Sequence, residues 1–468
     1  MTGKNYLGDA AVIARIVLTG RLVVKSPVCI GDGNGEDGGN PSNSKDIHVQ
    51  KNKKEQPFIP GTSMCGVLRC LMEESRNEPL AALIFGGTAD NEGQSLLQVY
   101  DTVLEGANLA YRDGVAINYY TGVAKDGAKY DYEVVDKGEG CFRLEAVIRQ
   151  KYVRQKNEIR KAIIWIKDKL SHGIRVGAMT AKGLGLVKLE ECKLGFYDLA
   201  ENTDDVKAWF MKPEAWGDDA SDGMTEASEQ DISNQWPVFE GDFALRSTMI
   251  IRSDNVDVNE GSNTHIDQVF LKNSSGQYVV PGASFKGVLR HQARYILGKI
   301  QGQGNSAESF LNQFMGYSEN IEKRSKSRFY VAESILTDAV REKVITRNRI
   351  DRVTGGVMDS ALFTSVPVFQ NKAGEKALHV KFFIKPDHKT NNHAEIGLVI
   401  LLFRDLWQGR IAIGGETGIG RGTLKGLSGK FSIDGIEYII NEAGEVRAEN
   451  GDISKLDEYV RALVMEVQ

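Results

Sequence analysis

Two aspartates occupy equivalent places in the two halves of the sequence. Asp46 lies fourteen residues before Pro60, and Asp267 lies fourteen residues before Pro281. A carboxylate in such a loop can hold a divalent cation that positions a ribose 2′-hydroxyl for in-line attack on the neighbouring phosphate. A single loop aspartate is more often a turn former or a cap. The repetition is what favours a catalytic role for this pair.

Each aspartate precedes a Pro-Gly motif that predicts the start of a helix. Segments 58–69 and 279–290 share the pattern apolar-apolar-Pro-Gly-small-Ser-x-x-Gly-Val-Leu-Arg, and we call the separation of Pro60 from Pro281 the Pro-Gly spacing. Ser63 and Ser284 are predicted N-caps, because a serine hydroxyl accepts from the free N–H groups of a first turn. Such a helix start can bind phosphate, and an ordinary capped helix is the simpler alternative. Basic residues that could add charge follow in both segments: Arg69, Lys286 and Arg290.

A glycine-rich segment closes each half, at 177–185 and 414–422, and we call the separation of Gly183 from Gly420 the loop spacing. Dense glycine permits positive φ and lets backbone N–H groups approach an anion. The segments lack the GxxxxGK[ST] phosphate loop, and they precede a strand, which excludes a dinucleotide-binding fingerprint. A tight turn packed on a sheet is the simpler interpretation. The candidate RNA contacts in these segments are Lys182, Gly183, Gly185, Gly418, Gly420, Arg421 and Gly422.

A third repeated pattern surrounds a Thr-Gly turn. Thr121 and Thr354 begin the two turns, and we call their separation the turn spacing. Aromatic side chains beside Lys and Arg suit stacking on exposed bases. The first half supplies tyrosines around its turn, at Tyr119, Tyr120, Tyr130 and Tyr132. The second half supplies arginines that are candidate RNA contacts, at Arg347, Arg349 and Arg352.

Three collinear motifs indicate a tandem duplication within the 468 residues. A chain of this length suits two domains. The predicted first domain, called the first half below, is 1–200, and the second domain, called the second half, is 241–468. Residues 201–240 are acidic and weakly periodic, so they predict a linker.

The order of predicted elements is the same in both halves. Apolar strands open them at 12–18 and 243–251, and helices follow the Pro-Gly motifs at 64–76 and 285–300. Further strands, helices and closing strands are expected at 96–103, 157–170 and 186–189, and at 329–335, 395–407 and 423–424. This order predicts an α+β fold with a ferredoxin-like βαββαβ core and long insertions.

Composition excludes several classes of protein. The net charge of −5 argues against coating nucleic acid through overall charge, although a local basic track is compatible with it. The five cysteines include no CxxC pair, which disfavours a zinc site or disulfide framework and suits a reducing cytosol. No apolar run approaches a membrane span and no signal segment is recognisable, so we expect a cytoplasmic protein without a membrane partner.

These motifs together resemble the RAMP superfamily, the repeat-associated RNA-binding proteins of CRISPR systems. The segments His265-Ile266-Asp267-Gln268-Val269 and Arg349-Ile350-Asp351-Arg352-Val353-Thr354-Gly355 look like those of type III backbone subunits. The resemblance implies two tandem ferredoxin-like, RRM-like RAMP domains. It places a thumb-hairpin insertion near 118–135 and another near 351–368. Two joined subunits suggest a type III-D-like arrangement.

The resemblance also implies an activity. Such subunits polymerise along a guide RNA, insert a thumb hairpin that displaces a base of the guide–target duplex, and use a loop aspartate for metal-dependent cleavage of target RNA. By position, Asp267 and Asp46 are the implied catalytic and metal-binding residues, with Mg²⁺ or another divalent cation as cofactor. The implied partners are the guide RNA, the complementary target RNA and other effector subunits, including a large polymerase-like subunit.

Two alternatives remain at the level of sequence. The chain could be a guide-RNA-binding scaffold without catalysis. It could also be a guide-processing endoribonuclease, although such enzymes usually use a catalytic histidine and the histidines here are not repeated at matching positions. His48 and His265 lie two residues from the aspartates, where a surface role is the simpler interpretation.

Overall fold

The computed structural model describes residues 6–32, 47–75, 78–87, 93–211, 236–253, 266–301, 306–318, 324–387 and 391–468. The chain forms two compact units. Unit 1 comprises Met1–Tyr111, Asp131–Thr180 and Leu184–Ser233, and unit 2 comprises Arg112–Tyr130, Ala181–Gly183 and Asn234–Gln468. Two short segments of the first half therefore belong to unit 2, together with the whole second half.

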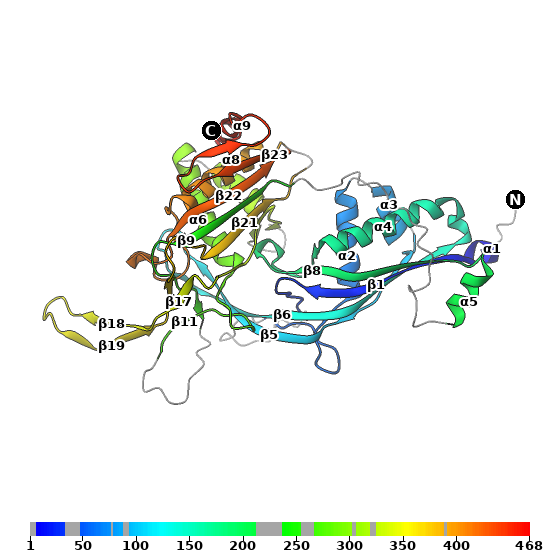
Figure 1. Ribbon diagram of the computed structural model, residues 1–468, viewed down its shortest axis with the longest axis horizontal. Helices are drawn as coiled ribbons and strands as arrows, with labels where there is room; N and C mark the ends of the chain where they lie inside the picture. Colours follow the sequence, from blue (N-terminus) through cyan, green and yellow to red (C-terminus); the bar gives the residue numbers. More distant parts are fainter. Residues whose placement is uncertain are drawn as a thin grey trace. The chain divides into compact units, whose positions relative to one another are not determined.

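Unit 1 is built on an antiparallel sheet in the order β3-β6-β1-β8-β7, with β5 paired to β6 (Figure 1). Helices α2, α3 and α4 pack on it through the apolar core. Its strands are β1 (Val12–Val24), β2 (Phe58–Ile59), β3 (Leu97–Val99), β4 (Thr102–Val103), β5 (Glu105–Ile117), β6 (Ala124–Arg149), β7 (Ile174–Arg175) and β8 (Leu186–Asp198). Its helices are α1 (Tyr6–Ala10), α2 (Gly61–Glu74), α3 (Glu78–Phe85), η1 (Gln150–Gln155), α4 (Lys156–His172), η2 (Thr180–Lys182) and α5 (Thr203–Met211). The elements β5, β6 and η2 extend into unit 2.

Unit 2 contains a second six-stranded antiparallel sheet, in the order β15-β21-β9-β22-β23-β24 (Figure 1). These strands are β9 (Val238–Leu245), β15 (Phe329–Val331), β21 (Leu378–Ile384), β22 (Leu424–Ile433), β23 (Ile436–Ile440) and β24 (Val446–Ala448). The helices are α6 (Gly282–Gln301), α7 (Ser306–Met315), α8 (His393–Trp407), η3 (Thr417–Ile419) and α9 (Lys455–Val467). Phe382 of β21 contacts both Phe285 of α6 and Phe403 of α8, so aromatic packing joins the sheet to these helices.

Short strand pairs surround the second sheet. They are formed by β10 (Arg252–Ser253) with β11 (Val269–Phe270), β12 (Val279–Val280) with β16 (Ser334–Ile335), β13 (Tyr317–Ser318) with β14 (Arg324–Ser325), β17 (Val340–Glu342) with β20 (Val368–Gln370), and β18 (Ile345–Ile350) with β19 (Val357–Ser365). The β18–β19 pair, called the second hairpin below, extends away from the second sheet (Figure 1). The mixed helix and antiparallel strand content confirms the predicted α+β ferredoxin-like class.

The helices after the Pro-Gly motifs begin earlier than predicted. Helix α2 starts at Gly61, and its N-cap is Pro60 in an extended conformation with φ −61° and ψ 137°. Ser63 is the third helical residue of α2, and Ser284 is the third of α6. The serine N-cap prediction is therefore wrong. The proline already holds the φ of the cap position, and the N–H of Gly61 donates to Asp101 Oδ1 at 2.8 Å.

The glycine-rich segments follow the same backbone path in both halves. Matching positions have left-handed φ values of 82° and 94° at Gly177 and Gly414, 56° and 60° at Met179 and Glu416, 96° and 88° at Gly183 and Gly420, and 86° and 82° at Gly185 and Gly422. A Cβ added at Gly177 or Gly414 would lie 2.3 Å from a backbone oxygen, that of Cys29 or Ile250. The turn and the close approach both require glycine.

The predicted linker has ordered elements at both ends. Helix α5 occupies Thr203–Met211, where Asp205 accepts from the N–H of Asp198 at 2.8 Å, and β9 begins at Val238. Residues 212–235 lie outside the described residues. The boundaries 1–200, 201–240 and 241–468 remain predictions. Among the described helices, none has the length and apolar character needed to cross a membrane.

Two glycines of α2 provide a matched test of packing. A Cβ at Gly61 would lie 2.0 Å from the carbonyl oxygen of Val99, whereas a Cβ at Gly66 would meet nothing within 4 Å. We expect Gly61→Ala to destabilise the chain by roughly 1–3 kcal/mol through overpacking. Gly66→Ala should stabilise it by about 0.5–1 kcal/mol through helix propensity. Urea unfolding followed by circular dichroism checks both, and equal effects would contradict the close packing at Gly61.

Candidate nucleic-acid interface

Asp267 lies at the root of the second hairpin. Its N–H donates to the carbonyl oxygen of Thr364 at 2.9 Å, and the N–H of Thr364 donates to Asp267 Oδ2 at 2.7 Å. The next residue, Gln268, forms a parallel bridge with Ser365 at the end of β19. Asp267 is itself exposed. An exposed carboxylate is thus held in a defined orientation where the hairpin meets the body of unit 2.

Asp46 lies outside the described residues, but its neighbour is described. Ile47 forms a parallel bridge with Tyr132, just as Gln268 does with Ser365. Ile47 and Gln268 are related by the Pro-Gly spacing, and Tyr132 and Ser365 are related by the turn spacing. The two halves therefore bring the chain past the hairpin root along the same path.

Three arginines surround one glutamate beside this root. Glu416, in the glycine-rich loop, is 2.8 Å from Arg421, 2.5 Å from Arg347 and 3.7 Å from Arg252. Arg421 is buried, and its Nη1 also donates to Ser365 Oγ at 3.4 Å. Burial lowers the pKa of Arg421, and the Glu416 carboxylate opposes that effect. One carboxylate against three guanidinium groups leaves an excess of positive charge, which favours an anion.

The first half lacks this arginine cluster. The spacings between the repeated motifs show which residues of the first half correspond to the arginines and to Glu416, and all of these residues are uncharged. Arg252, Arg347, Glu416 and Arg421 correspond to Gly31, Gly114, Met179 and Leu184. A Cβ at Gly114 would lie 2.3 Å from the ring of Tyr130, so an aromatic side chain covers the place that Arg347 takes in the second half. The two hairpin roots have the same backbone path but differ in the charge of their side chains.

The second hairpin presents cations and apolar groups together. Arg349 and Arg352 are exposed. Asp351 Oδ1 accepts from the N–H groups of Thr354 and Val353, both at 2.8 Å, and these bonds lower the pKa of Asp351. The large apolar side chains exposed on the hairpin are Ile350, Val353, Val357, Met358, Leu362 and Phe363. Such a surface suits contact with phosphates and unstacked bases.

The predicted contacts near the starts of α2 and α6 are largely internal. Lys286 is buried, and its Nζ donates to Ser327 Oγ at 2.6 Å, to the Phe329 carbonyl at 2.9 Å and to the Ala181 carbonyl at 3.5 Å. Burial lowers the pKa of Lys286 to about 7. Lys286 therefore binds backbone oxygens of the protein, and its ammonium faces inward.

Arg290 and Arg69 also have protein partners. Arg290 donates to the Gly316 carbonyl at 2.8 Å and to Asn312, and burial lowers the pKa of Arg290. Arg69 is half-buried and donates to Glu73 Oε1 at 2.8 Å one turn along α2. Ser63 and Ser284 are half-buried within their helices. The predicted contacts at the helix starts thus have partners within the protein, whereas the predicted contacts Arg349 and Arg352 are exposed on the second hairpin.

The two glycine-rich loops differ in exposure. Gly183 and Gly185 are buried and Lys182 is half-buried, and a Cβ at Gly183 would lie 2.7 Å from the backbone nitrogen of Glu333. Gly418 and Gly420 are exposed, with nothing within 4 Å of an added Cβ, while Gly422 is buried. The exposed part of this repeated loop therefore lies in the second half.

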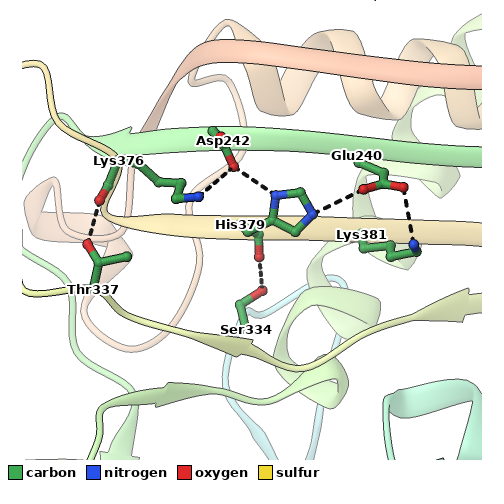
Figure 2. A network of polar contacts seen from close by, with 7 residues as sticks. All are labelled: Glu240, Asp242, Ser334, Thr337, Lys376, His379 and Lys381. Atoms are coloured by element: carbon green, nitrogen blue, oxygen red, sulfur yellow. Dashed lines mark hydrogen bonds and ion pairs between the residues drawn. The ribbon is translucent and has the colours of Figure 1, made fainter.

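A polar network that none of the repeated sequence motifs marks lies on the second sheet (Figure 2). His379 Nδ1 is 2.7 Å from Asp242, its Nε2 is 3.4 Å from Glu240, and Lys381 pairs with Glu240 at 3.1 Å. Burial alone would raise the pKa of Glu240, but the hydrogen bond from Lys381 and nearby cations hold it below its usual range. The alternation of polar and apolar residues in β9 was the available signal. Both nitrogens of His379 face carboxylates, so the residue joins two strands.

Two antiparallel sheets, each accompanied by a left-handed glycine-rich loop and a hairpin, define a tandem duplication of one α+β module. The family model of the RAMP superfamily matches residues 21–188 and 237–425. The chain therefore belongs to the RAMP superfamily, CRISPR-associated proteins that bind RNA, and both halves carry the match. A search of the curated proteins gives no match.

Lys286 provides a test of the buried interior. Its pKa of about 7 lies below the unperturbed value of about 10.4, so between these pH values the unfolded chain binds a proton that the folded chain does not. Stability at this site therefore rises with pH, by up to about 1.4 kcal/mol per pH unit.

We expect the stability of the native chain relative to Lys286→Met to increase from pH 7 to pH 10, as measured by urea unfolding at each pH. Exposed Lys299→Met in the same helix is the control. A difference that does not vary with pH would show that Lys286 is charged inside the fold.

Proposed function

We propose that the chain is a type III CRISPR effector backbone subunit, fused from two RAMP domains, that binds guide RNA and cleaves complementary target RNA beside Asp267. The observation that supports cleavage is the arrangement of side chains at the root of the second hairpin. Thr364 holds the Asp267 carboxylate, and the adjacent Ser365 contacts the buried Arg421. The Asp267 carboxylate and the arginine cluster thus contact two consecutive residues of strand β19, Thr364 and Ser365.

The second hairpin supplies the proposed RNA contacts. Exposed Arg349 and Arg352 suit phosphates, which carry most of the affinity of RNA-binding proteins. Leu362 and Phe363 are 65% and 57% exposed, which suits apolar contact with a splayed base. A hairpin of this kind, inserted into a guide–target duplex, would open the nucleotide next to Asp267 to in-line attack.

The residues present fit a divalent cation of the Mg²⁺ type. Among the described residues, no group of three or more His, Cys, Asp and Glu could hold a metal by itself. Mg²⁺ commonly uses only one or two carboxylates and completes its shell with substrate phosphate and water. Asp267 meets that requirement in the second half. When bound, such a cation would polarise the scissile phosphate and favour deprotonation of the 2′-hydroxyl.

The chain's own residues have separate roles in this proposal. The N–H of Thr364 orients the carboxylate, and Arg421 and Arg347 stabilise negative charge that develops on the phosphate. Glu416 neutralises part of the arginine charge, which makes burial of Arg421 possible without an anion present. Asp46 is the corresponding carboxylate of the first half. Because that root lacks the arginines, we expect slower cleavage there.

The cleavage proposal is tested with Asp267→Asn and Asp46→Asn in the assembled complex with guide RNA, Mg²⁺ and labelled complementary RNA. We expect Asp267→Asn to lose one set of cuts and Asp46→Asn to lose a second, weaker set, because each removes one metal-binding carboxylate. Guide binding, measured by filter retention, should persist in both variants.

Asp351→Asn is the matched control, because Asn118 forms the same turn in the first half, accepting from Tyr120 and Thr121. Unchanged cuts in both aspartate variants would identify the chain as a scaffold. Cleavage of the guide itself, lost on mutation of a histidine, would indicate guide processing.

The RNA contacts of the second hairpin are tested through salt dependence. Arg349→Ala should weaken binding of unrelated single-stranded RNAs by a similar factor and reduce the slope of log K against log salt by about 0.7, because one phosphate contact is lost. Exposed Arg447 on β24 is the control, and Arg447→Ala should leave the slope unchanged. Fluorescence anisotropy at four salt concentrations measures both, and equal slopes for the two variants would place the RNA elsewhere.

A further inference from the structure

The segment 151–172, which forms most of η1 and all of α4 in unit 1, is strongly basic. It contains five lysines and two arginines against one aspartate and one glutamate, in a chain whose net charge is −5. We call six of these cations the basic face: Lys151, Arg154, Lys156, Arg160, Lys161 and Lys167. The segment lies outside all three repeated motifs. Its charge is opposite in sign to that of the chain as a whole.

Most residues of the basic face have no carboxylate partner. Lys156 pairs with Asp198 at 2.5 Å. Within the part of the chain that the structure describes, no carboxylate forms an ion pair with the other five residues of the basic face. A helix face that is only solvated commonly mixes both signs of charge and gains from ion pairs one turn apart. Here the like charges add up to a field that favours a polyanion.

Aromatic rings lie beside several of these cations. The guanidinium of Arg160 is 5.0 Å from the centre of the Phe196 ring, and the ammonium of Lys156 is 5.4 Å from it. Lys151 lies 4.6 Å from the centre of the Tyr152 ring. These contacts hold long side chains against the protein, which reduces the entropy that they lose on binding phosphate. Cations interleaved with aromatic rings are typical of surfaces that bind single-stranded nucleic acid.

The corresponding face of the second half is covered by protein. By the loop spacing, three residues of the basic face correspond to positions in α8: Lys156 to His393, Arg160 to Gly397 and Lys161 to Leu398. A Cβ at Gly397 would lie 2.2 Å from the carbonyl oxygen of Tyr459 in α9, and the rings of His393 and Tyr459 are 5.0 Å apart. Leu398 is fully buried. This face of the repeated helix is therefore a contact surface in the second half.

In the first half, the helix that follows the closing strand lies on the other side of the sheet (Figure 1). The ring of Trp209 in α5 lies 5.4 Å from that of Tyr197 in β8. Successive residues of a strand point to opposite faces, and Phe196 is on the side of α4 because Arg160 contacts it. Helix α5 thus leaves the basic face uncovered, and Lys161 is exposed.

We propose that the basic face of η1 and α4 binds single-stranded RNA through its phosphates, as a second RNA site on residues other than those of the second hairpin. An α-helix rises 1.5 Å per residue, so Lys156 and Lys167 are roughly 16 Å apart along the axis, and a stacked strand places about five phosphates over that length. RNA is the ligand because the chain belongs to a superfamily that binds RNA. The contact is independent of base sequence, since phosphates carry none. The proposal does not depend on cleavage at Asp267.

Lysine acetylation read by mass spectrometry tests the site on the full-length wild-type chain. Single-stranded RNA of mixed sequence, added at about ten times its Kd, should slow acetylation of Lys161 and Lys167 roughly tenfold, because only the unbound protein reacts. Exposed Lys188 and Lys207 of the same unit are the controls and should react at an unchanged rate. Equal protection of all four lysines, or of none, would overturn the proposal.

The same footprint separates this site from the second hairpin and RNA from other polyanions. Protection of Lys161 should persist in Arg349→Ala, and its loss there would show that the hairpin alone holds the RNA. Protection by poly-glutamate but not by RNA would identify an acidic protein as the partner. In cells irradiated with ultraviolet light, peptides from 151–172 should carry ribonucleotide adducts, whereas deoxyribonucleotide adducts there would contradict RNA as the ligand.

Charge reversal measures the contribution of the basic face to affinity. In the Arg349→Ala background, the added pair Arg154→Glu and Lys161→Glu should weaken binding of single-stranded RNA about tenfold or more. It should also reduce the slope of log K against log salt by about 1.4, because two phosphate contacts are lost. The pair Lys188→Glu and Lys207→Glu makes the same change of net charge and should leave the slope unchanged. Equal effects of the two pairs in fluorescence anisotropy would show that overall charge, and not this face, governs binding.

Discussion

The position of each central helix depends on a close backbone contact that only glycine permits. Gly61 and Gly282 begin α2 and α6 directly after proline, and an added Cβ at either would lie within 2.5 Å of a carbonyl oxygen of the following strand, that of Val99 or Val331. The helix start therefore lies against the edge of its sheet. This contact sets the start of each central helix against its sheet, and it occurs in both halves.

At these two helix starts, groups that could bind an anion have partners within the protein. In α2 the first N–H is taken by Asp101, and in α6 the nearby cation Lys286 is directed to backbone oxygens. Arginines gather instead at the root of the second hairpin, where Arg421, Arg347 and Arg252 share Glu416. A single carboxylate keeps these guanidinium groups together without RNA and leaves positive charge for a phosphate.

The two halves have the same backbone conformation at their repeated motifs but carry different charged residues there. The glycine-rich loops have matching left-handed residues, and the hairpin turns have matching Asx bonds at Asn118 and Asp351. Charge is distributed unequally, because the arginine cluster of the second half corresponds to Gly31, Gly114, Met179 and Leu184. The hairpin formed by β5 and β6, called the first hairpin, places the ring of Tyr119 against His291 of α6, whereas the second hairpin is basic and has Val353 exposed at its tip.

Sequence alone determined the duplication, the α+β class, the family resemblance and the equivalence of Asp46 and Asp267, because these follow from local patterns and their spacing. Its motifs marked Arg349 and Arg352 as candidate RNA contacts, and both residues are exposed on the second hairpin, whose first strand begins at Ile345, before the expected range 351–368. It failed for Lys286 and the serine caps, since burial and cap geometry depend on a strand that lies far away in the chain. Only the tertiary structure brought Glu416 to three arginines from separate segments and laid the first hairpin on α6. Spacing in one dimension carries no information about which distant side chains share a surface.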